Sequence, residues 1–131
     1  MGRRSSKGFR DFPGRRWLIV VLRGLHVAGV VGCGAGLLGA PLPPGGVFAG
    51  LLLCGGLGMA LLDAWSNPVW LKEYAGLAFV FKLVLLCLLV VWESQRLALF
   101  WMLLGYSVLV SHAPASFRHQ RIGDAAVPEK L

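Results

Sequence analysis

Residues 75–92 read Ala-Gly-Leu-Ala-Phe-Val-Phe-Lys-Leu-Val-Leu-Leu-Cys-Leu-Leu-Val-Val-Trp, an apolar run with one charge in it. Its length matches the roughly 20 residues that an α-helix needs to cross a hydrocarbon core about 30 Å thick. The charge is Lys82, near the middle of the run. Inserting an ammonium group at that depth costs roughly 3 kcal/mol of free energy on insertion scales. We therefore expect a partner, a water-filled cavity or a ligand beside it.

The composition of the whole chain agrees with a membrane protein. Of the 131 residues 56% are hydrophobic and the mean hydropathy is +0.69, whereas soluble domains are about 45–50% apolar. Charged residues make up 15% and lie mostly near the ends of the chain. These values exclude a soluble globular domain, so the net charge of +7 is not a nucleic-acid footprint and we expect no nucleic-acid partner.

Three more apolar segments accompany residues 75–92, namely 17–40, 47–65 and 97–113. The first ends at Pro41-Leu-Pro-Pro-Gly-Gly46, which cannot continue a helix. The third helix is expected to start early, with Asn67 as its cap and Pro68 in its first turn. The predicted fold is all-α: an antiparallel bundle of four transmembrane helices over residues 17–113, with a basic tail at 1–16 and a second tail at 114–131.

The distribution of Lys and Arg predicts the orientation in the membrane. The two tails and the loop 66–74 carry Arg3, Arg4, Lys7, Arg10, Arg15, Arg16, Lys72, Arg118, Arg121 and Lys130, while the loop 41–46 has none and 93–96 has only Arg96, beside Glu93. Because basic loops stay inside, both termini are predicted to be cytoplasmic, in a bacterial-type inner membrane. The basic amino-terminal tail is expected to contact anionic lipid headgroups of the bilayer.

Small residues recur at every fourth position of the first segment: Gly24, Ala28, Gly32, Gly36 and Ala40. Such spacing favours a groove that admits a neighbouring backbone. Gly46 and Gly50 form a shorter version at the start of the second segment. We therefore predict tight antiparallel packing of the first two helices.

Polar side chains inside the spans are candidates for a functional site. His26 lies nine residues into the first segment and Lys82 seven into the third, about 14 and 10 Å from the same side at 1.5 Å per residue. Arg23 is one turn from His26, and Tyr106 lies within the fourth segment. A cytoplasm-facing cavity walled by these four side chains, with Asp63 as a further candidate, is predicted.

The residue types in this set suit two kinds of chemistry. A neutral imidazole with cations beside it fits an anionic, planar, metal-bearing ligand such as haem b, with His26 on the iron. Buried His, Lys and Tyr also serve as proton relays. The sequence shows no nucleotide-binding loop, paired carboxylates or Ser-His-Asp order, and its three cysteines lack the Cys-x-x-Cys spacing of zinc sites.

Two stretches carry a resemblance to a known family. Leu22-Arg-Gly-Leu-His-Val-Ala-Gly-Val-Val-Gly32 resembles the first helix of the membrane-bound protoporphyrinogen oxidases and the related copper-resistance D-type membrane domains. Trp70-Leu-Lys-Glu-Tyr and Phe81-Lys-Leu-Val-Leu-Leu86 resemble a later helix of that family, which carries Lys-Leu. The resemblance implies haem binding that depends on His26 and Lys82.

The leading functional hypothesis is therefore haem or porphyrin handling in the helical core, with His26, Lys82, Arg23 and Tyr106 at the site. A non-catalytic membrane subunit or assembly factor of a larger complex is one alternative. A small transporter, which four short spans could build only as a homo-oligomer, is another. The sequence leaves open whether the protein is an enzyme.

Overall fold

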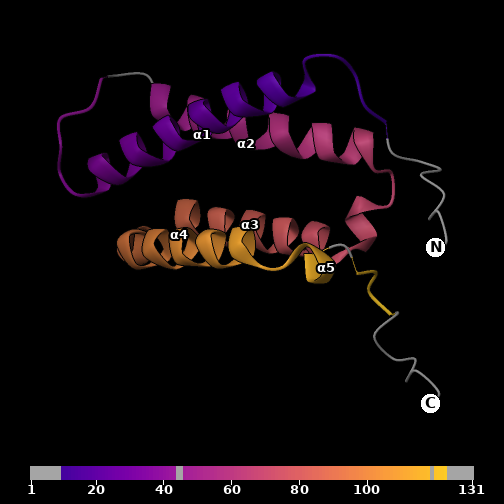
Figure 1. Ribbon diagram of the computed structural model, residues 1–131. Helices are drawn as coiled ribbons and strands as arrows, with labels where there is room; N and C mark the ends of the chain where they lie inside the picture. Colours follow the sequence, from indigo (N-terminus) through magenta and orange to yellow (C-terminus); the bar gives the residue numbers. More distant parts are fainter. Residues whose placement is uncertain (1–9, 44–45, 119, 124–131) are drawn as a thin grey trace, which may run out of the picture. The chain divides into compact units, whose positions relative to one another are not determined.

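The computed structural model describes residues 10–43, 46–118 and 120–123, and these residues form helices joined by short turns (Figure 1). The long helices are α1 (Arg15–Leu37), α2 (Val47–Ser66), α3 (Tyr74–Val91) and α4 (Arg96–His112); the short ones are η1 (Trp70–Lys72), η2 (Glu93–Gln95) and α5 (Ala115–Arg118). In the described part of the chain the only β-pairing is one isolated bridge between Glu73 and Arg121. The prediction of an all-α fold is confirmed.

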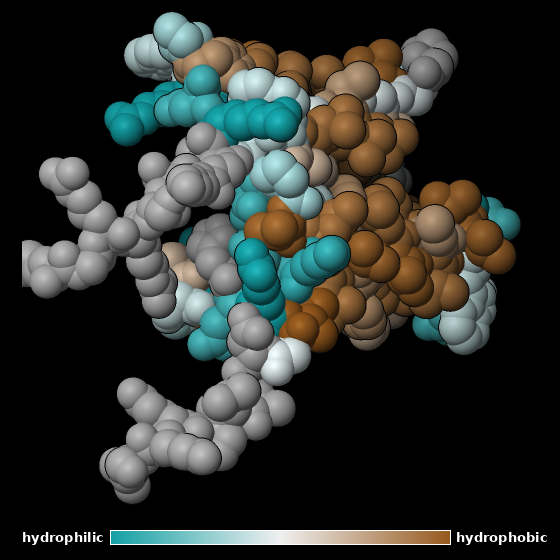
Figure 2. Space-filling model, turned by 90° about the vertical axis from the view of Figure 1, so that its right-hand side faces the viewer, coloured by the Kyte–Doolittle hydropathy of each residue, from teal (hydrophilic) through white to brown (hydrophobic). Residues whose placement is uncertain are grey.

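Three of these helices, α1, α2 and α3, are long and apolar enough to cross a membrane. Large hydrophobic side chains are exposed along them, among them Val31, Leu61 and Val91, and Figure 2 shows hydrophobic side chains covering much of the visible helical surface. Exposed apolar surface on this scale is typical of helices that face lipid. The chain is therefore a membrane-embedded protein.

The contacts divide the chain into two compact units, residues 1–68 and 69–131. In the first unit α1 and α2 form an antiparallel hairpin (Figure 1). Gly39, with φ +90°, ends α1 just before Pro41, and Gly46, with φ +67°, precedes α2. Glycine adopts these left-handed conformations without strain, which is why the two helices stop and start there.

The two helices of this hairpin approach one another through glycines. A Cβ atom on Gly29 would clash with the backbone of Leu52, and one on Gly32 would clash with the ring of Phe48. One on Gly55 would lie 2.5 Å from the carbonyl oxygen of Leu22. Since side chains are absent at these points, the backbones can pack directly against each other.

The predicted packing of the first two helices is confirmed, but the predicted row of contact residues is right only in part: Gly32 lies against Phe48 of α2, whereas others of the row do not face that helix. Gly24 and Gly50 face open space, and Ala28 is exposed. A spacing of four residues turns 400° around a helix of 3.6 residues per turn, so it drifts by about 40° at each step. Alternating steps of three and four hold one face, as at Gly29, Gly32 and Gly36.

In the second unit α3 and α4 pair antiparallel, joined by the η2 turn. Tyr106 of α4 contacts Phe81 of α3 with ring centroids 4.9 Å apart. Arg96 closes the turn: its Nε and Nη2 donate to the carbonyls of Leu89 and Val90 at 3.3 and 3.1 Å, and its Nη1 lies 3.3 Å from Glu93. This one side chain satisfies carbonyls that the end of α3 leaves without helical partners.

The expectation that the third helix begins at Asn67 and Pro68 is wrong. Asn67 is extended, with φ −132° and ψ 93°, and closes α2 instead. Residues 70–72 form a separate 3-10 turn, and Glu73 is again extended before α3 starts at Tyr74. The turn packs tightly on the first turn of α3, because a Cβ on Gly76 would lie 2.5 Å from the carbonyl of Trp70.

Candidate functional site

His26 is held between α1 and α2 by one hydrogen bond and two glycines. Its Nδ1 lies 2.8 Å from the carbonyl oxygen of Leu52 on α2. The ring occupies space that glycine leaves free, since a Cβ on Gly56 would lie 2.9 Å from Nδ1. A Cβ on Gly55 would lie 2.6 Å from the backbone nitrogen of His26. The imidazole is thus fixed by the second helix of the hairpin.

This hydrogen bond defines the proton position on a neutral ring. A carbonyl oxygen only accepts, so Nδ1 must carry the proton and donate it to Leu52. The lone pair of a neutral imidazole then lies on Nε2, which has no hydrogen-bond partner among the described residues. An Nδ1–H bonded to a backbone carbonyl, with Nε2 free, is the arrangement of histidines that ligate metals.

Arg23 lies on α1, one helical turn from His26. Its side chain is exposed and makes no hydrogen bond or ion pair within the described residues. Side chains three apart are neighbours on a helix surface, so the guanidinium can lie near whatever binds at the imidazole.

Lys82 and Tyr106 belong to the second unit. Lys82 is half-buried near the middle of α3, and its ammonium has no hydrogen bond or ion pair in the described part of the chain. The Tyr106 hydroxyl donates to the carbonyl of Ala78, one turn before Lys82, at 3.4 Å. Within α3 the same carbonyl is the expected acceptor for the Lys82 backbone N–H.

The structure thus groups the four predicted site residues into two pairs, each within one unit. His26 and Arg23 share a stretch of α1, and Tyr106 docks on α3 within a turn of Lys82. A single cavity walled by all four residues stays a prediction.

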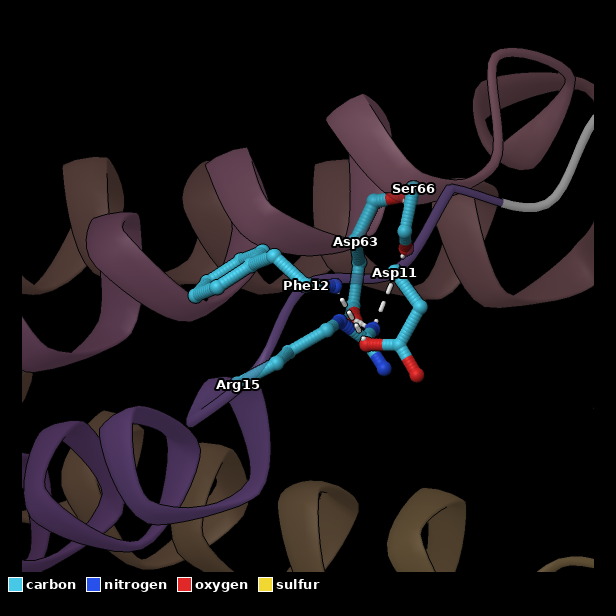
Figure 3. A network of polar contacts seen from close by, with 5 residues as sticks. All are labelled: Asp11, Phe12, Arg15, Asp63 and Ser66. Carbon is cyan, nitrogen blue, oxygen red and sulfur yellow. Dashed lines mark hydrogen bonds and ion pairs between the residues drawn. The ribbon is translucent and has the colours of Figure 1, made fainter.

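Asp63, the further candidate, takes part in a different cluster at the ends of α1 and α2 (Figure 3). Arg15 Nη2 lies 3.6 Å from Asp63 Oδ1 and donates to Ser66 Oγ at 3.1 Å. Ser66 is almost fully buried, and its backbone carbonyl accepts from the N–H of Arg10 at 2.9 Å. These contacts fasten the segment before α1 to the end of α2.

Sequence reasoning missed this cluster because Arg15 was assigned to the basic tail. Its carboxylate partner is 48 residues away along the chain, and no local motif connects the two. The aromatic rings of Phe12 and Trp65 meet beside the cluster, edge to face, with centroids 5.8 Å apart. Asp63 is therefore part of a helix-end contact, as a polar residue at a membrane interface commonly is.

Other described side chains able to bind metals lie on separate helices or bond within their own turn. Cys33, Cys54 and Cys87 are free thiols on α1, α2 and α3. His112 bonds within its own turn, with Nδ1 2.8 Å from the carbonyl of Val108. The described residues contain no group of three or more His, Cys, Asp or Glu side chains able to hold a metal ion. Haem needs no such group, because the porphyrin supplies four of the iron ligands.

Comparison with protein-family models, with curated proteins and with solved structures gave no match to this chain. The resemblance to the protoporphyrinogen oxidase and copper-resistance D-type proteins therefore remains a prediction from the quoted motifs.

Proposed function

We propose that the protein is a four-helix integral membrane protein that binds haem b through His26. The observation that carries the proposal is the 2.8 Å contact between His26 Nδ1 and the Leu52 carbonyl. It fixes both the tautomer and the orientation of the ring and leaves Nε2 as the donor for iron. Bound haem would supply one-electron redox chemistry, which suits either electron transfer or tetrapyrrole handling.

The two mid-span cations support an anionic ligand. Arg23 and Lys82 lack an acidic partner among the described residues, and an unneutralised cation within a span is costly. Haem propionates are negatively charged, and either cation could form an ion pair with one of them. Arg23 is the better placed for a ligand on His26, since the two side chains lie one turn apart.

Four crossings and cytoplasmic termini are part of the proposal. The hairpins place the segment before α1 at the end of α2, and residues 120–122 at the start of α3. The link from Ser66 at the end of α2 to Tyr74 at the start of α3 could extend to at most about 29 Å, and the 3-10 turn at Trp70–Lys72 shortens it further. It is therefore too short to cross a hydrocarbon core of about 30 Å. Both termini and this loop then share one side, which the Lys and Arg distribution assigns to the cytoplasm of a bacterial-type inner membrane.

Two features support this topology. The 17 residues of α4 stand at the lower limit of a spanning helix, and α4 packs against α3 through Tyr106, which contacts Phe81 and Ala78. Arg96, the one basic residue of the opposite loops, is bound to carbonyls of α3 and to Glu93. The positive charge of Arg96 therefore has its partners within the turn.

A non-catalytic role as a subunit or assembly factor is the competing proposal. It is favoured by the bonds that His26 and Tyr106 make to helix carbonyls, since these bonds could serve packing alone. The two proposals differ in what His26 Nε2 does, and a spectrum separates them.

The test is the visible spectrum of the detergent-purified protein, oxidised and then reduced with dithionite, after expression with a haem precursor. We expect a sharp reduced band that His26→Ala removes. His112→Ala is the matched control and keeps the band, because His112 bonds only within its own turn. Lys82→Met should perturb the band, whereas Lys72→Met, at the helix end, should not. A flat spectrum from folded wild-type protein overturns haem binding and favours the packing role.

A further inference from the structure

The segment after α4 is fastened to the start of α3. Ile122 N–H donates to the carbonyl of Lys72 at 3.0 Å, and Tyr74 N–H donates to the carbonyl of Gln120 at 3.2 Å. The rings of Tyr74 and Phe117 stack, with centroids 5.0 Å apart and planes 8° from parallel. We call residues 115–118 and 120–122 the C-terminal strap.

The position of the strap relative to α3 fixes its depth in a membrane. α3 is a candidate span that begins at Tyr74. Because the strap bonds to residues 72–74, it lies where α3 leaves the hydrocarbon core, at the level of the lipid headgroups. Aromatic side chains such as Tyr74 and Phe117 are enriched at that level.

The side chains on this end have the composition of an interfacial anchor. Leu71, Phe117 and Ile122 are 60, 52 and 53% exposed. Large apolar side chains that are exposed at this level are suited to enter the boundary between the lipid headgroups and the acyl chains. The side chains of Lys72 and Arg121 are exposed too, and neither makes an ion pair or hydrogen bond within the described residues. Exposed apolar groups and unpaired cations thus stand side by side.

We propose that the C-terminal strap, with Leu71 and Lys72, is a docking surface for anionic phospholipid headgroups. Lys72 and Arg121 would bind the phosphate groups while Leu71, Phe117 and Ile122 enter the acyl boundary. An unpaired cation near an anionic membrane surface strengthens binding by about 5-fold. The surface is separate from the basic amino-terminal tail, and it requires only that α3 span a membrane, not that haem bind.

The test uses the full chain in nanodiscs and measures the fluorescence of a label attached to the strap. A bimane label is placed at Gln120→Cys after Cys33, Cys54 and Cys87 are replaced by Ala, with unchanged elution and circular dichroism as the condition for use. The discs contain phosphatidylcholine with or without phosphatidylglycerol, and a trace of lipid with a nitroxide on its headgroup. We expect the nitroxide to quench the label, more strongly with phosphatidylglycerol.

A double variant and a second label position identify the cause of the extra quenching in phosphatidylglycerol. Lys72→Gln with Arg121→Gln should abolish the extra quenching in phosphatidylglycerol, while the strap stays in place because backbone groups make its bonds to α3. A label at Gln95→Cys, on the η2 turn at the other end of α3, should not respond to phosphatidylglycerol. The proposal is overturned if the label at residue 120 is not quenched, since the strap would then lie away from the headgroups and be open to a protein partner instead. Equal quenching with and without phosphatidylglycerol overturns it as well. So does a double variant that keeps the extra quenching in phosphatidylglycerol.

Discussion

Replacing Gly55 by Ala tests how closely α1 and α2 pack. The added Cβ would lie 2.5 Å from the carbonyl oxygen of Leu22 and 2.6 Å from the backbone nitrogen of His26. Both atoms are backbone, so neither can rotate away. Ordinary contact begins at 3.4 Å, and 3.4 − 2.5 gives a required separation of about 0.9 Å.

That separation also breaks the bond that holds His26. Moving α1 away by about 0.9 Å would stretch the Nδ1 to Leu52 contact from 2.8 Å to about 3.7 Å, beyond hydrogen-bonding range. Overpacking costs about 1–3 kcal/mol and the lost hydrogen bond about 0.5–1.5 kcal/mol. We expect Gly55→Ala to be less stable than a matched control by about 1.5–4.5 kcal/mol.

The matched control is Gly50→Ala on the same helix. A Cβ there meets nothing within 4 Å, so the variant gains only the helix propensity of Ala, about 1 kcal/mol, which Gly55→Ala gains as well. The assay is unfolding in mixed micelles with increasing dodecyl sulfate, followed by far-ultraviolet circular dichroism. Equal midpoints for the two variants would refute direct backbone packing at Gly55.

Two further variants test the polar contacts. Tyr106→Phe removes the 3.4 Å bond to Ala78 but keeps the ring on Phe81, so the same unfolding assay should show a loss of at most about 1 kcal/mol; a loss as large as that of Gly55→Ala would contradict this. Arg15→Gln removes the cation that links Asp63 and Ser66, so we expect about 1 kcal/mol of destabilisation and faster trypsin cleavage after Arg10, measured by mass spectrometry; unchanged cleavage would show that the backbone bond to Ser66 alone holds the segment.

The long elements could be predicted from the sequence because apolar run length decides them. The fourth segment, predicted over 97–113, is a helix over Arg96–His112, and the second, predicted over 47–65, runs from Val47 to Ser66. Prolines and glycines predicted a break between the first two helices, although α1 ends at Leu37, three residues before the predicted end at Ala40, and α2 begins at Val47 as predicted. The failure at Asn67 has a local cause: two extended residues, Asn67 and Glu73, interrupt a stretch that had a plausible cap and a proline.

The finer contacts could not be predicted because they depend on the rotation of one helix against another. The sequence marked small residues on α1 but not which of them face α2, so Gly24 was included and Gly29 was not. His26 was identified from its depth in the first segment and from the family resemblance. Its acceptor, a backbone carbonyl at Leu52, carries no sequence signature, because every residue has one.

The most direct test of haem ligation by His26 is a cavity variant, His26→Gly, expressed with haem precursor and examined by reduced-minus-oxidised absorbance. We predict that the variant loses the sharp reduced band and that added imidazole restores it, because free imidazole can occupy the space of the missing ring and supply the nitrogen to iron. A reduced band that persists in His26→Gly without imidazole would contradict ligation by His26.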